Sequence, residues 1–363
     1  MSPETMREAL SAFDLGSPAL SALPHGQGHI NDTFRVTTQS GKEFILQRIS
    51  AAAFHRPDRV MENMLRVTEH LRQKIAARGG DPDRETLTVV PTRDGGSFYT
   101  DSRGGAWRAT LFIRDSRCYL SPQNPRQLFA AGEAFGRFQG LLADYPAHTL
   151  HETIPRFHDT VDRLEKLKAA AQADPLGRRE SCLEELSFAL SRESDCSVAL
   201  GAQRGGLLPL HVTHNDAKLS NILFDARSHQ PLCVVDLDTV MPGLAIYDFG
   251  DLVRSGAHRG REDDRDPSRV QLDRELFRAL AAGFIRGADG ALSREELAFL
   301  PWGGRLMTLE CGIRFLTDYL EGDVYFHTSR DRHNLDRCRT QFKLVGEMES
   351  SWAELNAIIA EYA

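Results

Sequence analysis

The sequence contains no run of 18 or more apolar residues, so it lacks a segment able to cross a bilayer as a helix. Its first eight residues are polar and lack the apolar stretch of a secretion signal. We therefore expect a cytoplasmic protein with no membrane partner. Positive charge is not in excess either, because the formal net charge is −7. This balance argues against a nucleic-acid partner.

Cysteine is also scarce. The chain has six cysteines, and no two of them form a Cys-x-x-Cys pair. We therefore expect free, buried thiols rather than a disulfide framework. The pairs His148–His151 and His211–His214 lack cysteine or carboxylate companions at zinc-like spacing, which argues against a structural zinc site.

A length of 363 residues exceeds what one compact core usually holds, and the sequence changes character near residue 114. We expect an α+β fold with a small β-rich lobe, residues 1–113, and a larger, mainly helical lobe, residues 114–363. In the first lobe the predicted elements are a helix over 57–77 and strands at 34–36, 44–47, 86–90, 97–100 and 106–113, the last three as a meander. In the second they are helices at 157–172, 179–199, 246–256, 271–286, 304–320 and 333–360 around a β-rich island, 210–238.

The β-rich island contains the residues with the clearest chemistry. His214, Asp216 and Asn221 form the pattern His-x-Asp-x-x-x-x-Asn, directly before an apolar strand. A turn leads into a second strand, 232–235, which ends at Asp236. A hairpin of these strands brings Asn221 and Asp236 close enough to share one magnesium ion. The arrangement is typical of phosphoryl transfer, which needs a carboxylate at the attacking hydroxyl and metal ligands at the β/γ-phosphates.

The spacing of these residues assigns their roles. Asp216 is the predicted base, and Asn221 and Asp236 are the predicted metal ligands. Lys218 can neutralise charge on the transferred phosphoryl group. Asp238 shares a face of the extended chain with Asp236, and it holds either a second metal ion or a hydrogen bond.

Two neighbouring residues are predicted to brace the loop that carries this motif. His214 should hydrogen-bond within the loop, because Asp216 already fills the role of base. Asp248 lies near the start of a predicted helix, where free backbone N–H groups and the helix dipole favour a carboxylate. We expect Asp248 to cap that helix or to brace the loop.

The small lobe carries a weaker signal for a nucleotide. Gly26 and Gly28 precede its first clear strand, and glycines there let the backbone approach phosphate groups closely. Kinase-like folds place a lysine on the next strand to hold the α/β-phosphates, but this sequence has Gln47 there. Glu62, on the following helix, is either a partner for such a cation or a surface carboxylate. The candidate nucleotide-binding residues are Gly26, Gly28, Asn31, Thr33, Gln47 and Glu62.

These motifs resemble those of the aminoglycoside phosphotransferase and choline kinase superfamily of protein-kinase-like enzymes, and more narrowly those of bacterial N-acetylhexosamine 1-kinases. The matching segments cover both predicted lobes. They are GHINDTF (28–34), FILQRI (44–49), MEN (61–63), HNDAKLSNILFD (214–225), PLCVVDLDTVMPGLAIYDFGDLVRSGA (231–257) and LECGIRFLTDYLEGDVYF (309–326). Glutamine at position 47 is in keeping with this subfamily.

The resemblance implies transfer of a phosphoryl group from ATP, with Mg²⁺, to the anomeric hydroxyl of N-acetylglucosamine or N-acetylgalactosamine. It implies Asp216 as the base and Asn221 with Asp236 as metal ligands. It also implies sugar contacts from Asp216, Lys218, Arg314 and Tyr325, and from His29 and Asn31 unless these two shape the phosphate loop instead. The partners are then a sugar and a nucleoside triphosphate, and we expect a monomer.

The residues themselves leave alternatives open for the acceptor. Arg314 and Tyr325 offer donors suited to sugar hydroxyls or an acetamido carbonyl, whereas an aminoglycoside calls for carboxylates and choline for an aromatic cage. Arg314 could instead pair with Asp318, one turn further along its helix. The competing functions are a kinase of another hexose, an aminoglycoside or an amino alcohol, and a pseudokinase scaffold that only binds nucleotide. The intact loop motif argues against the scaffold.

Overall fold

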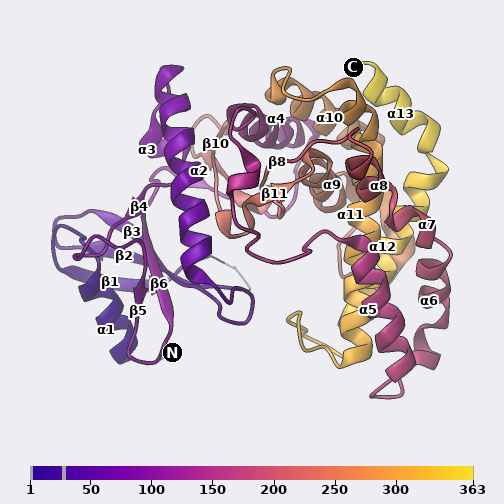
Figure 1. Cartoon of the computed structure of the whole chain (residues 1–363), viewed down its shortest axis with the longest axis horizontal. Helices are drawn as coiled ribbons and strands as arrows, with labels where there is room; N and C mark the ends of the chain where they lie inside the picture. Colours follow the sequence, from indigo (N-terminus) through magenta and orange to yellow (C-terminus); the bar gives the residue numbers. More distant parts are fainter. Residues whose placement is uncertain (1–2, 27–29, 363) are drawn as a thin grey trace. The chain divides into compact units, whose positions relative to one another are not determined.

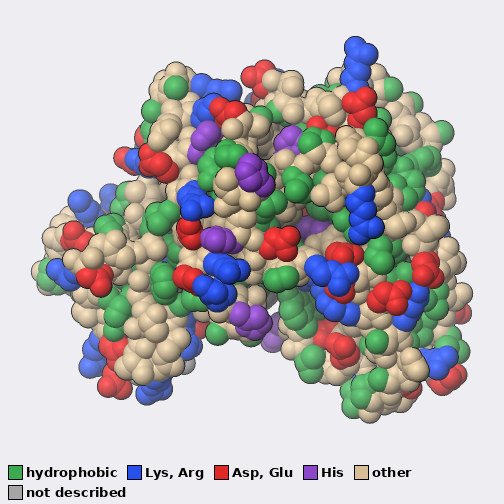
Figure 2. All heavy atoms as spheres, viewed as in Figure 1, with side chains coloured by type: hydrophobic (Ala, Val, Ile, Leu, Met, Phe, Trp, Pro, Cys, Tyr) green, Lys and Arg blue, Asp and Glu red, His purple; other side chains and the backbone are tan. Residues whose placement is uncertain are grey.

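The computed structural model describes residues 3–26 and 30–362, which divide into two compact units (Figure 1). The first unit takes residues up to 117 and two later segments, 149–155 and 223–241. The second unit takes 118–148, 156–222 and 242–363. Among the described residues no helix is both long and apolar enough to span a bilayer. Figure 2 shows acidic and basic side chains interspersed over the visible face.

A six-stranded antiparallel sheet forms the centre of the first unit. Its strands are β1 (Ala19–Pro24), β2 (Asp32–Thr38), β3 (Glu43–Arg48), β4 (Val89–Val90), β5 (Tyr99–Thr100) and β6 (Ala106–Leu111). The order is β1-β2-β3-β6-β4, and β5 also pairs with β6, so the predicted meander is wrong. The turn after β5 is tight, because Asp101 N bonds to the Gly105 carbonyl. Hence β5 pairs with only the first residues of β6, and β4 pairs with a later stretch.

The two faces of this sheet differ in polarity. Leu46 and Trp107 are buried in a core that includes residues of helix α1 (Pro3–Ala12). Side chains alternate across a sheet, so the neighbours of these residues point to the opposite face. Gln47 and Arg108 are such neighbours, and they lie directly opposite each other on β3 and β6. The polar face of the sheet is therefore the one turned away from α1.

Helix α2 (Pro57–Ala77) confirms the predicted helix with the same bounds and is followed by the one-turn α3 (Pro82–Glu85). The fully buried Asn63 on α2 holds both later segments of the first unit. Its Nδ2 donates to the carbonyls of His151 (2.8 Å) and Val240 (2.9 Å), and its Oδ1 accepts from His151 N (2.9 Å). Buried amide groups need such partners, so Asn63 explains why 149–155 and 223–241 fold with the first unit.

Smaller sheets surround the predicted island. The predicted hairpin is confirmed as β9 (Ile222–Asp225) and β10 (Pro231–Val234), with β7 (Ser116–Arg117) beside β9. The strand before the loop is β8 (His211–Thr213), which pairs with β11 (Met241–Gly243). A further pair is β12 (His258–Arg259) and β13 (Gln271–Leu272). Short 3₁₀ turns are η1 (Ala147–Thr149), η3 (Leu219–Asn221), η4 (Leu237–Thr239) and η5 (Pro267–Arg269).

Helices make up most of the second unit. The long ones are α4 (Pro125–Leu141), α5 (Thr160–Ala173), α9 (Ala245–Gly256), α10 (Arg274–Ala288), α11 (Arg294–Glu321), α12 (His333–Ser350) and α13 (Trp352–Ala360). The single helix predicted over 179–199 is wrong. The chain forms η2 (Arg179–Cys182), α6 (Leu183–Leu190), α7 (Glu193–Cys196) and α8 (Val198–Arg204) instead. Ser191 and Ser197 lie at the breaks, and their hydroxyls bond to nearby carbonyls, which competes with regular helix formation.

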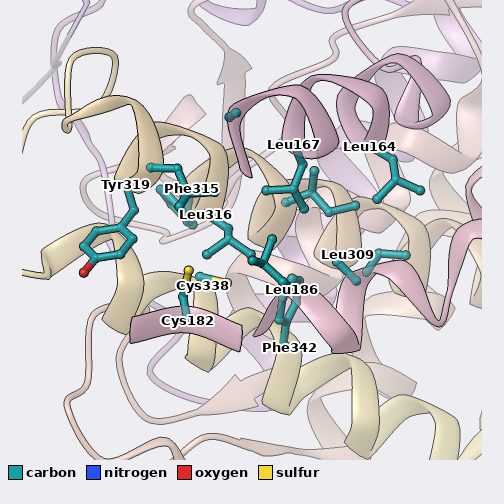
Figure 3. Packing of buried hydrophobic residues seen from close by; sticks show 14 of the residues in the cluster. Leu164, Leu167, Cys182, Leu186, Leu309, Phe315, Leu316, Tyr319, Cys338 and Phe342 are labelled. Atoms are coloured by element: carbon teal, nitrogen blue, oxygen red, sulfur yellow. The ribbon is translucent and has the colours of Figure 1, made fainter. Parts of the chain in front are cut away.

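The core of the second unit lies among α5, α6, α11 and α12. Figure 3 shows side chains from these helices, including Leu167, Leu186 and Phe342, packed together. All six cysteines are free, and Cys182 and Cys338 are part of this core. The expectation of buried thiols is wrong for Cys118, which is exposed.

Helices α4 and α10 pack unusually closely. A Cβ atom at Gly136 would lie 2.1 Å from the Phe284 carbonyl oxygen, so only glycine fits there. One turn further along α4, Gln139 is buried and donates to Asp248 on α9. The close packing of α4 on α10 therefore helps to position Gln139 for its bond to Asp248.

Candidate active site

Residues 214–221 lie between β8 and β9 in the second unit and are here called the catalytic loop, because they contain the predicted base. The fully buried carboxylate of Asp248 on α9 accepts hydrogen bonds from the backbone N–H groups of His214 (2.9 Å) and Asn215 (2.8 Å). It also accepts from Gln139 Nε2 (2.7 Å). Burial raises the pKa of Asp248, against the lowering effect of His214 and these donors. The predicted bracing role of Asp248 is confirmed.

Asn215 gives the loop its sharp bend. Its φ of 63° is in the left-handed region, which asparagine tolerates better than most residues. The Asn215 side chain accepts from Thr213 Oγ1 (3.0 Å) and donates to the Thr213 carbonyl (3.2 Å). Gly243 lies so close that a Cβ atom there would be 2.2 Å from Thr213 Oγ1. The conformation just before Asp216 is therefore fixed from several sides.

Asp216 is held by the two loop residues that the sequence motif predicts beside it. Lys218 Nζ lies 2.7 Å from Asp216 Oδ2, and Asn221 Nδ2 lies 3.1 Å from the same oxygen and 2.8 Å from the Asp216 carbonyl. Burial would raise the pKa of Asp216, but the charge and hydrogen bond of Lys218 hold it below its ordinary value. Asp216 is therefore ionised at neutral pH. His214, which is fully buried, accepts at Nδ1 from Asp216 N (3.3 Å), as a bracing residue should.

A row of polar side chains crosses the sheet of the first unit. Thr33, Gln47 and Arg108 are cross-strand neighbours on β2, β3 and β6. Gln47 donates to Thr33 Oγ1 (3.0 Å) and accepts from Arg108 Nε (2.9 Å). Arg108 forms an ion pair with Asp238, and both side chains are at most 3% exposed. Asn31 Nδ2 donates to the other Asp238 oxygen (2.6 Å).

Arg108 is the member of this polar row that the sequence interpretation missed. It lies opposite Gln47, where a lysine was expected, so the first unit has a buried cation on the strand next to the expected one. The signal was available: an arginine in the middle of an apolar strand must be paired if that strand is buried. Its partner Asp238 was predicted either to hold a metal ion or to form a hydrogen bond, and in the structure it bonds to Arg108 and Asn31.

The segment after β10 is fastened to the first unit at three points. Besides the Arg108–Asp238 pair, Thr153 Oγ1 donates to the Asp238 carbonyl (3.1 Å) and Asn63 Nδ2 to the Val240 carbonyl (2.9 Å). Asp236 begins the segment with a φ of 64°, an uncommon conformation for a residue with a side chain. Strained backbone that is held by its surroundings often marks a functional position.

The remaining predicted nucleotide residues are less closely connected. Gly26 has a φ of 77° and is exposed, in keeping with a turn that needs glycine. Gly28 and His29 lie outside the described residues. Glu62 pairs with Arg66 and with His151 Nε2 (2.7 Å), so it is engaged at the surface of α2. Their contacts to nucleotide or sugar stay predictions.

Arg314 lies among aromatic rings in the second unit. Its guanidinium carbon is 5.4 Å from the ring centroids of Phe157 and Phe326 and 5.7 Å from that of Tyr325. The alternative pairing with Asp318 is wrong. Asp318 accepts instead from the backbone N–H groups of residues 324, 325 and 326, at 2.7–3.0 Å, and from Asn334. These bonds hold the turn after α11 and thereby place the Tyr325 and Phe326 rings beside Arg314.

A β-rich unit with a helix, a larger helical unit, and a His-x-Asp-x-x-x-x-Asn loop before a hairpin define a protein-kinase-like phosphotransferase fold. The predicted two-lobed α+β class is confirmed. The chain belongs to the phosphotransferase enzyme family, whose sequence profile matches residues 21–290.

Solved structures with low sequence identity share this fold. One is a microcompartment-associated aminopropanol kinase, 19% identical, with a TM-score of 0.64 over 97% of this chain and 98% of that one. An amicoumacin kinase in complex with AMP-PNP and Ca²⁺ is 15% identical, with a TM-score of 0.59 over 93% and 91%. A choline kinase from Cryptosporidium parvum is 12% identical, with a TM-score of 0.54 over 92% and 90%.

Proposed function

We propose that this enzyme transfers the γ-phosphoryl group of ATP to the anomeric hydroxyl of an N-acetylhexosamine, N-acetylglucosamine or N-acetylgalactosamine, to give the sugar 1-phosphate. The observation that supports this acceptor is the environment of Arg314. Three aromatic rings surround a cation there, but the cation is the chain's own guanidinium. An ammonium group of choline, an amino alcohol or an aminoglycoside would be repelled, whereas a sugar hydroxyl or acetamido carbonyl can accept hydrogen bonds.

Arg314 has the donors that such an acceptor needs. Within residues 3–26 and 30–362, the guanidinium has no hydrogen-bond or ion-pair partner, and the residue is only partly buried. Five N–H groups are therefore available to a bound molecule. Tyr325 is 58% exposed, so its hydroxyl is accessible as well. We assign Arg314 and Tyr325 to the sugar, together with Lys218, Asp216 and the predicted contact of His29.

The reaction follows from the state of Asp216. The anomeric oxygen attacks the γ-phosphorus, the bond from phosphorus to the β–γ bridging oxygen breaks, and ADP leaves. Asp216 is ionised, so it orients the hydroxyl and takes its proton. Lys218, 2.7 Å from Asp216, offsets negative charge on the group in transfer.

Asn221 and Asp236 suit a magnesium ion by their chemistry. Asn221 donates its amide N–H groups to Asp216, and no described residue donates to its Oδ1. Carbonyl and carboxylate oxygens are the ligands that Mg²⁺ prefers. We assign both residues to the ion, because Asn221 directly precedes β9 and Asp236 follows its sheet partner β10. When bound, Mg²⁺ neutralises charge on the β/γ-phosphates. We assign Asp238, paired with Arg108, to holding this segment.

A coupled ADP-release assay tests the proposal. It compares N-acetylglucosamine, N-acetylgalactosamine, glucose, galactose, choline and kanamycin, with ATP and with or without Mg²⁺. We expect Mg²⁺-dependent turnover of the N-acetylated sugars and little of the two cationic acceptors. Turnover of choline or kanamycin alone would overturn the sugar assignment and keep the kinase. ATP binding with no turnover of any acceptor would favour the scaffold.

Replacing Arg314 should affect the acceptor selectively. We expect Arg314→Gln to raise the KM for the sugar about 10- to 100-fold, since a hydrogen bond from a charged donor contributes about 1.5–3 kcal/mol. The KM for ATP should not change. The matched control is Arg286→Gln, which removes another arginine stacked on a phenylalanine, Phe129. An unchanged sugar KM in Arg314→Gln would remove this residue from the acceptor site.

A further inference from the structure

His158, just before α5 in the second unit, is a largely buried histidine that has no part in the reaction proposed above. Its Nδ1 lies 2.8 Å from Glu310 Oε1 and its Nε2 lies 3.0 Å from the carbonyl oxygen of Asn215. The His158 side chain is 10% exposed and that of Glu310 is 2% exposed. A backbone carbonyl and an ionised carboxylate can only accept hydrogen bonds. Both ring nitrogens must then carry a proton, so the geometry requires an imidazolium.

The surroundings support a charged ring. Thr160 Oγ1 donates to the second Glu310 oxygen (2.7 Å), which stabilises the carboxylate. Burial alone lowers the pKa of His158, but the charge and hydrogen bond of Glu310, with a contribution from Asp251, raise it above the ordinary value. The pKa of Glu310 is lowered in turn: burial raises it, but His158, with help from Arg314, outweighs burial. Arg163 is a further charged group that interacts with Glu310.

Aromatic rings enclose the imidazole. The ring of Tyr247 on α9 lies 5.1 Å from it, and that of Phe157 lies 4.6 Å from it, between ring centroids. The ring therefore has little room to turn away from its two acceptors.

His158 acts on the residue directly before the proposed base. The Asn215 N–H group is bonded to Asp248, and the Asn215 carbonyl is bonded to His158. The carbonyl belongs to the peptide group that joins Asn215 to Asp216. The backbone of Asn215, with its φ of 63°, is therefore held at both its N–H and its carbonyl. These two bonds determine the direction of the chain at Asp216.

We propose that His158 is a positioning residue, which as an imidazolium between Glu310 and the Asn215 carbonyl holds Asp216 in the orientation needed for phosphoryl transfer. The proposal rests on the proposed role of Asp216. Loss of the ring proton leaves either the carbonyl or the carboxylate without a donor, and the peptide before Asp216 is released.

The pH dependence follows from the sign of the shift. The pKa of His158 is above its ordinary value of 6.5, so the pair contributes most to stability below about pH 6.5. The contribution is lost as the pH rises through the folded-state pKa. We therefore expect kcat to decrease on the alkaline side, at the pH at which His158 loses its proton.

The first test is a ¹H–¹⁵N spectrum of the imidazole rings of the full wild-type chain at pH 7.5. The His158 signals are assigned by their absence in His158→Gln. We expect both nitrogens of His158 to be protonated. A neutral His158 ring at that pH would overturn the proposal. This result needs no acceptor or nucleotide, so it does not depend on whether Asp216 is the base.

The second test compares pH profiles of kcat. His158→Gln should lower kcat about 10- to 100-fold, because small misplacements of a reacting group have effects of this size, and leave both KM values unchanged. In Glu310→Gln the alkaline decrease should move to lower pH. The control is His211→Gln, which breaks a similar buried pair, His211–Glu296 (2.6 Å; 13% and 3% exposed), without a bond to the catalytic loop. We expect no change in its pH profile.

A merely structural role would give a different pattern. Glu310→Gln would then lower kcat by the same factor at every pH, and this outcome would overturn the proposal. If neither variant folds, the wild-type chain still tests the proposal. His158 should then lose its ring proton in the NMR spectrum at the same pH at which kcat decreases, and a mismatch between the two would overturn the proposal. Failure of the kinase proposal itself is separate, because the wild-type chain would then turn over no acceptor, whereas the protonation state of His158 would still be measurable.

Discussion

Asp216→Asn should lower kcat about 10³-fold, within the range that a positioned base contributes. The change is nearly isosteric, and an asparagine can still accept hydrogen bonds from Lys218 and Asn221 at its carbonyl oxygen. What it loses is the negative charge and the ability to take the proton of the acceptor hydroxyl. We therefore expect the nucleotide to bind as tightly as before. Steady-state kinetics measures the first effect, and calorimetric titration with an ATP analogue measures the second.

The control for Asp216→Asn is Asp289→Asn. Asp289 directly follows α10 as its C-terminal cap, with a φ of 51°, and asparagine also tolerates this conformation. We expect this variant to keep the wild-type kcat. If Asp216→Asn retained a rate close to that of Asp289→Asn, Asp216 would not be the base.

Arg108→Met should lower the free energy of unfolding by about 3–5 kcal/mol, the usual effect of removing one partner from a buried ion pair. Asp238 would be left 3% exposed, with Asn31 still donating to one of its oxygens. The side-chain oxygen of Gln47, Oε1, would lose its donor Arg108 Nε as well. Urea unfolding followed by fluorescence measures the effect, and Trp107, the neighbour of Arg108 on β6, is the one tryptophan before residue 302.

Two comparisons separate charge from packing. Arg108→Met combined with Asp238→Asn should be less destabilised than the single Arg108 variant, because no unpaired charge stays buried. Arg156→Met removes an exposed partner of Asp159 and should cost less than about 1 kcal/mol. If Arg108→Met were as stable as Arg156→Met, the Arg108–Asp238 pair would not hold the segment that contains Asp236.

Local features of this chain were predictable because their causes are local. Helix α2 begins at a proline and has apolar residues at helical spacing, and its bounds were predicted as observed. The catalytic loop and its hairpin could be predicted for the same reason: the motif, the apolar strands and the turn are contiguous. Asp248 was predictable as a brace, since carboxylates near helix starts seek free N–H groups.

Features that depend on distant contacts could not be predicted. The Arg108–Asp238 pair joins residues 130 positions apart, and Asn63 binds carbonyls 88 and 177 positions away. The spacing of apolar residues along the sequence, which predicts helices and strands, contains no information about such pairs. His158 has no sequence signal of its own either, because its partners Glu310 and Asn215 are brought to it only by the folding of α11 and β8.

The most direct test of the central claim is a phosphorus NMR spectrum of the product formed from N-acetylglucosamine, ATP and Mg²⁺. The proposed reaction predicts a phosphate signal coupled to the anomeric proton, together with loss of the sugar's reducing end. A phosphate coupled to the protons of another carbon would show transfer to a different hydroxyl. That result, or no product from either N-acetylated sugar while another acceptor is phosphorylated, would contradict the assignment of this enzyme as a 1-kinase of N-acetylhexosamines.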